Sequence, residues 1–133
     1  MKKTVVIILL ALVAVAPSCR SKKMEPVSPR NEVTIPMREE RFTFTQEADR
    51  ISQGTNTHFV IMGSFQVREN AERFSETLRG LGFRPTILLS ETGFHRVSSN
   101  SYLIEDEARA RVMQIRSEFQ AYADTWLLIR RTN

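Results

Sequence analysis

Few side chains in this sequence could carry out chemistry. His58 and His95 are the only histidines and Cys19 is the only cysteine, so no Cys/His group has metal-ligand spacing. The sequence also contains no phosphate-binding loop and no nucleophile elbow. The acidic run 105–107, "EDE", is typical of the first turn of a helix, where it complements the helix dipole. We therefore expect a protein that is not an enzyme and that uses no metal ion or cofactor.

A second set of side chains suits binding. The stretches "HFVIMGSF" (58–65) and "FHRVSS" (94–99) are predicted strands, and alternate residues of a strand point to opposite faces of a sheet. One face would then carry Phe59, Ile61, Phe94, Arg96 and Ser98, and the other Val60, Met62, Val97 and Ser99. A mixed aromatic, aliphatic, guanidinium and hydroxyl surface is typical of a binding site if it is exposed.

Two helices and two more strands must position these residues. Apolar residues at spacings of three and four predict a helix that ends at Gly80 and Gly82, with a buried face of Val67, Ala71, Phe74, Leu78 and Leu81. A second helix is predicted in 105–123, with a buried face of Ala108, Val112, Ile115, Phe119 and Tyr122. Further strands are predicted at "PTILLSE" (85–91) and "TWLLIRR" (125–131), with a tight turn at 91–93.

The order βαββαβ predicts an α+β fold built from two interleaved strand–helix–strand units. A loose internal similarity at a shift of 37 residues, which aligns Val60 with Val97 and Ala71 with Ala108, supports two related halves. Right-handed crossovers place both helices on one face of a four-stranded antiparallel sheet. The other face would be open for binding, unless residues 33–51 fold back over it or two copies pack face to face.

The first 19 residues are typical of an exported lipoprotein. Two lysines precede the twelve apolar residues 5–16, which are fewer than the roughly 20 that cross a bilayer and predict a signal peptide over 1–18. "AVA" (14–16) offers another cleavage site, but Pro17 would follow the cut. "APSC" resembles a bacterial lipobox, so we expect cleavage before Cys19 and its lipidation. The absence of an acidic stretch in "CRSKK" favours a periplasm-facing anchor, and we expect the outer rather than the inner membrane.

Residues 19–57 are expected to form the lipidated cysteine and a tether. Three prolines lie among charged and polar residues, and few large apolar residues precede Phe42. "RFTFT" (41–45) could add a short edge strand, and "SQGTNT" (52–57) is expected to be a joint. The folded domain is then expected at 58–133.

The stretch 58–131 resembles a SPOR domain from end to end. The resemblance lies in a strand of alternating pattern that ends in Gly-Ser-Phe, in "ENA" at the start of the first helix, and in "LRGLGF" at the end of that helix. It continues through "HRV" and the "EDEA" start of the second helix. The whole layout, with signal, tether and C-terminal domain, resembles small envelope lipoproteins of Bacteroidota. The resemblance implies a ferredoxin-like or RNP-like α+β fold. It also implies non-catalytic binding of peptidoglycan, in particular of glycan strands from which amidases have removed the stem peptides, at division sites.

The resemblance places the binding positions on the open face, at Ile61, Ser64 and Phe94. Sugar rings stack on aromatic and aliphatic side chains, here Phe59, Ile61 and Phe94. Sugar hydroxyl and acetamido groups would bond to Ser64, Ser98 and the backbone near Gly63. Removing the peptide leaves a lactyl carboxylate on muramic acid, which Arg96 could pair with, although Arg96 could equally be a solvated strand residue.

Other functions remain open. The same face could dock a cell-wall enzyme or form a homodimer. An RNA-recognition module shares the βαββαβ order, but residues 58–133 hold ten arginines, no lysine and nine acidic residues, a net charge of +1 with the histidines neutral. That charge is too small for a phosphate-tracking surface, so we expect no nucleic-acid partner. Trp126 could stack on a glycan, but an anchor against the second helix is favoured.

Overall fold

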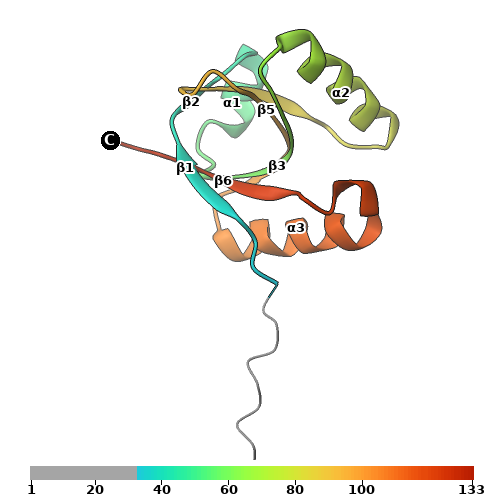
Figure 1. The fold of residues 1–133 in the computed structure, drawn as a ribbon. Helices are drawn as coiled ribbons and strands as arrows, with labels where there is room; N and C mark the ends of the chain where they lie inside the picture. The colour runs from blue at the N-terminus through green and yellow to red at the C-terminus, as the bar shows by residue number, and fades with distance from the viewer. Residues whose placement is uncertain (1–32) are drawn as a thin grey trace, which may run out of the picture. The chain divides into compact units, whose positions relative to one another are not determined.

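The computed structural model describes residues 33–133, so the expected signal peptide, Cys19 and the first part of the tether lie outside the described residues. The elements are β1 (Met37–Glu40), β2 (Phe42–Phe44), α1 (Glu47–Gln53), β3 (His58–Phe65), α2 (Arg68–Gly80), β4 (Thr86–Ser90), β5 (His95–Tyr102), α3 (Glu105–Glu118), a 3₁₀ turn (Gln120–Tyr122) and β6 (Trp126–Arg130) (Figure 1). The folded unit begins at Val33, well before the expected start at His58. Within 33–133, no helix is long and apolar enough to span a bilayer.

The predicted βαββαβ order is present from β3 to β6. These strands lie in the order β6-β3-β5-β4, each antiparallel to its neighbour, with the two strands that precede helices at the centre. The expectation of a four-stranded sheet is wrong, because β1 pairs with β6 and β2 pairs with β4 to give six strands. The predicted short strand near 41–45 corresponds to β2.

The turns follow the predicted glycine signals. Helix α2 ends in a Schellman motif, in which Phe83 N–H donates to Leu78 O and Gly82 N–H donates to Arg79 O, with Gly82 at φ 92°. Gly93, at φ 86°, closes the turn between β4 and β5, where Ser90 N–H donates to Phe94 O. Only glycine adopts such angles without strain.

Both long helices cover one face of the sheet. The main core joins Val60 and Met62 of β3 and Val97 of β5 to helix residues, which are Ala71, Leu78, Ala108, Val112 and Ile115. This confirms that Val60, Met62 and Val97 face the helices; Ser99, the fourth member of the predicted set, is buried but is not part of this cluster. Two predicted core positions at the ends of α2 are wrong, because Val67 and Leu81 are about half exposed. Helix α3 ends at Glu118, earlier than predicted, and Phe119 and Tyr122 pack on the core from the 3₁₀ turn that follows.

The six-stranded sheet is curled so strongly that one segment of chain closes it. β1 and β2 lie at opposite edges, yet only Arg41 separates them, so their nearest Cα atoms are at most about 7 Å apart. The edges of a flat six-stranded sheet would be about 24 Å apart. Residues 37–44, here called the crossing segment, therefore run from one edge to the other (Figure 1). At the crossing point, Arg131 N–H donates to Glu40 O and Glu91 N–H donates to Arg41 O.

The crossing segment covers much of the face that the sequence analysis expects to be open. A second apolar cluster fills the space beneath it, formed by Phe42, Phe59, Ile61, Leu88 and Leu128 with Phe44 and Trp126 beside them. The Phe42 ring meets the Phe59 ring edge-on, with centroids 4.9 Å apart. The expectation of a bare sheet face is wrong, and the alternative that residues 33–51 fold back over it describes the structure.

Candidate functional site

A row of alternating cationic and aromatic side chains runs from Arg38 of the crossing segment across one end of the sheet. The Arg38 guanidinium lies 5.7 Å from the centre of the Trp126 ring, and the Arg96 guanidinium lies 5.3 Å from it. Arg96 also lies 4.7 Å from the centre of the Phe94 ring. These distances are within the range of cation–π attraction. The row therefore joins β1, β6 and β5 at one end of the sheet.

The row borders a hollow of about 260 Å³, which we call the Trp126 hollow; it is lined by Pro36, Arg38, Ser64, Arg96, Asp124 and Trp126. Strand register places these residues together: Ser64 pairs with Arg96 across β3 and β5, and Ile61 pairs with Trp126 across β3 and β6. The lining is rich in hydrogen-bond donors and has one aromatic ring. Such a set suits an oxygen-rich ligand with apolar C–H faces.

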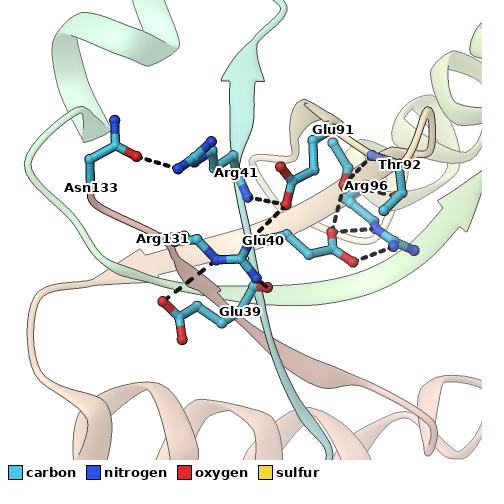
Figure 2. A network of polar contacts seen from close by, with 9 residues as sticks. Glu39, Glu40, Arg41, Glu91, Thr92, Arg96, Arg131 and Asn133 are labelled. Carbon is cyan, nitrogen blue, oxygen red and sulfur yellow. Dashed lines mark hydrogen bonds and ion pairs between the residues drawn. The ribbon is translucent and has the colours of Figure 1, made fainter.

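The Arg96 guanidinium is held by an acidic residue of the crossing segment. Arg96 Nη2 lies 2.7 Å from Glu40 Oε1, Arg96 Nε lies 3.2 Å from Glu40 Oε2, and the Ser90 hydroxyl donates to Glu40 at 2.7 Å (Figure 2). Glu40 and Arg96 are 7% and 5% exposed. The expectation that Arg96 lies on an open face is therefore wrong, and the charge that a ligand carboxylate would balance is already balanced by Glu40.

Three other predicted binding residues are buried. Phe59 and Ile61 have no exposed surface, because the crossing segment and its phenylalanines cover them. Ser98 is 1% exposed, and its hydroxyl donates to Asn100 O at 2.9 Å. The expectation that these side chains are accessible to a glycan is wrong in this closed sheet.

The remaining predicted residues lie at or near the Trp126 hollow. Ser64 lines it, and the Ser64 hydroxyl has no hydrogen-bond partner within residues 33–133. Phe94 is partly buried beside Arg96. Gly63 has a packing role: a Cβ atom there would lie 2.6 Å from the Phe74 ring and 2.8 Å from the Phe65 ring. No side chain fits at Gly63 without displacing these rings.

Sequence reasoning missed Arg38 and Asp124 and favoured an anchoring role for Trp126. Arg38 belongs to a segment with a tether-like composition, so no pattern assigned it to the sheet. Asp124 precedes the last strand without any motif. The only sequence signal was the position of Trp126, which shares parity with Leu128 on the second face.

No group of three or more metal-ligating side chains occurs within the described part of the chain.

A family model, described as SPOR domain, matches residues 54–125. No curated protein and no solved structure matches the chain. The matched range begins after β1 and β2, so Arg38, Glu40 and the rest of the crossing segment lie outside it.

Proposed function

Because the chain belongs to the SPOR-domain family, whose members bind peptidoglycan, we propose that it binds glycan strands at the Trp126 hollow without catalysing a reaction. The observation that carries this proposal is the combination of the Trp126 ring, the unpartnered Ser64 hydroxyl and the flanking guanidinium groups around one hollow. The indole offers an apolar surface to sugar C–H groups. The exposed Arg38 guanidinium offers donors to hydroxyl and acetamido oxygens, and the unpartnered Ser64 hydroxyl lies shielded from solvent in the wall of the same hollow.

The preferred ligand is a strand that has lost its stem peptides. Such a strand exposes its sugar rings and its lactyl carboxylates, both of which this hollow suits.

The competing proposal of a docking or dimer surface relied on an open sheet face, and the crossing segment fills most of that face. It therefore has less support than glycan binding.

The test is co-sedimentation of the full-length chain with purified sacculi, before and after amidase digestion. We expect stronger retention on the digested sacculi. Equal and negligible retention on both would reject glycan binding.

SPOR domains occur in bacterial envelope and periplasmic proteins, and we extend the proposal to an anchored form of this chain. Lipidation at Cys19 would hold it in the outer membrane facing the periplasm, and binding to digested strands would concentrate it at the division site. The lipobox-like "APSC" and the unpaired cysteine support this. Replacing Cys19 with Ser should release the protein from the membrane fraction, and unchanged fractionation would reject the anchor.

A further inference from the structure

Arg38 lies outside the matched SPOR range but lines the same hollow as residues inside it. Arg38 is on β1, and the pairing of β1 with β6 places it opposite Leu128, two residues after Trp126. Its guanidinium lies over the Trp126 ring. The crossing segment therefore contributes a side chain to the candidate site as well as covering the apolar cluster.

The charge balance of the hollow distinguishes its two arginines. Arg96 is paired with Glu40 in a buried contact, so its charge is balanced within the protein. Arg38 is exposed, and no carboxylate of residues 33–133 lies within ion-pair distance of it. Arg38 is thus the guanidinium of this hollow that can still bind an anion.

Asp124 also lines the hollow, and its carboxylate would repel an anionic ligand. The four charged groups Arg38, Arg96, Glu40 and Asp124 sum to zero. An anion must therefore be recognised by the local geometry of Arg38 rather than by a net positive field.

We propose that Arg38 determines the specificity of the site by pairing with a carboxylate of the glycan, the lactyl carboxylate of a muramic acid that has lost its peptide. This inference rests on the proposed function and adds a residue and a ligand group to it. Guanidinium and carboxylate can form two parallel hydrogen bonds, and an ammonium group cannot reproduce that fork. Trp126 beneath the guanidinium would hold it in place while the sugar ring contacts the indole edge.

The test compares Arg38→Gln and Arg38→Lys with the unmodified full-length chain. Two soluble ligands are used: peptide-free glycan oligomers that contain muramic acid, and N-acetylglucosamine oligomers of the same length, which lack carboxylates. We expect Arg38→Gln to weaken binding of the first ligand about tenfold, in line with a charge-assisted hydrogen bond. Binding of the second should change less than twofold, and Arg38→Lys should be intermediate on the first.

Arg84→Gln is the matched control. Arg84 is exposed and does not line the hollow, so this substitution removes the same charge elsewhere on the surface. Equal binding of the muramic-acid oligomer by Arg38→Gln and the unmodified chain would overturn the inference. Equal losses on both ligands, or an equal loss in Arg84→Gln, would also overturn it. Failure of the unmodified chain to bind either ligand would instead reject the proposed function itself.

Discussion

Glu40 and Arg96 form a buried ion pair that fastens the crossing segment to β5, with Glu40 Oε1 2.7 Å from Arg96 Nη2. Removing one partner leaves the other charged and buried, which costs about 3–5 kcal/mol. We therefore expect Glu40→Ala to lower the free energy of unfolding by about 3–5 kcal/mol, measured by urea denaturation followed by circular dichroism.

The double variant Glu40→Leu with Arg96→Met tests whether the two residues act together. It removes both charges at once. Its loss of stability should therefore be clearly smaller than the sum of the losses measured for Glu40→Leu alone and Arg96→Met alone. Additive losses would mean that the pair is not coupled.

A second prediction concerns the crossing segment as part of the core. Phe42 is 9% exposed and packs on Phe59, so Phe42→Ala should lower the free energy of unfolding by about 3 kcal/mol. Thr43→Ala is the control, since Thr43 is exposed on the same strand.

A chain that begins at Gly54, the first residue of the matched range, provides a stronger test of the same point. It would expose Phe59, Ile61, Leu88 and Leu128 to solvent. We expect it to bind a hydrophobic dye and to unfold at a much lower temperature. An unchanged unfolding midpoint would show that the crossing segment contributes no stability.

A third prediction concerns the packing role of Gly63. Gly63→Ala forces a Cβ atom against the Phe65 and Phe74 rings and should destabilise by about 1–3 kcal/mol. At Gly80, in the last turn of α2, a Cβ atom would meet nothing within 4 Å, so Gly80→Ala should be neutral or slightly stabilising. Equal effects of the two substitutions on thermal unfolding would contradict the packing role of Gly63.

A fourth prediction uses two serines whose shielded hydroxyls have no partner within residues 33–133, Ser64 and Ser99. Removing an unpartnered hydroxyl forfeits no hydrogen bond, so neither Ser64→Ala nor Ser99→Ala should lower the unfolding temperature. Ser64 lines the hollow, and Ser64→Ala should weaken glycan binding several-fold in a titration. Ser99→Ala should leave binding unchanged, and equal affinities of the two variants would remove Ser64 from the site.

The sequence predicted the α+β architecture well, because the spacing of apolar residues and the glycines at turns are local signals. Alternation in 58–65 assigned Val60 and Met62 to the helix side correctly, and Gly82 and Gly93 marked real turns. The same alternation placed Phe59 and Ile61 together on the other face, which is also correct.

The accessibility of that face was not predictable from the same signals. Residues 20–57 hold three prolines among charged and polar residues, so the composition of this stretch resembles a linker although it contains Phe42 and Phe44. Phe42 is buried on a strand that pairs with β4, where its partner Ser90 lies 48 residues away in sequence. A contact of that separation leaves no periodic pattern in the segment itself, and for the same reason Glu40 could not be recognised as the partner of Arg96.

The most direct test of glycan binding at the Trp126 hollow is an NMR titration of the isotope-labelled full-length chain with peptide-free glycan oligomers. If the glycan binds at this hollow, the indole N–H signal of Trp126 and the backbone signals of Arg38 and Ser64 will shift first and saturate together, while the signals of Leu88 and Leu89 stay unchanged. Shifts centred on Leu89 and β2, with Trp126 unmoved, would contradict it.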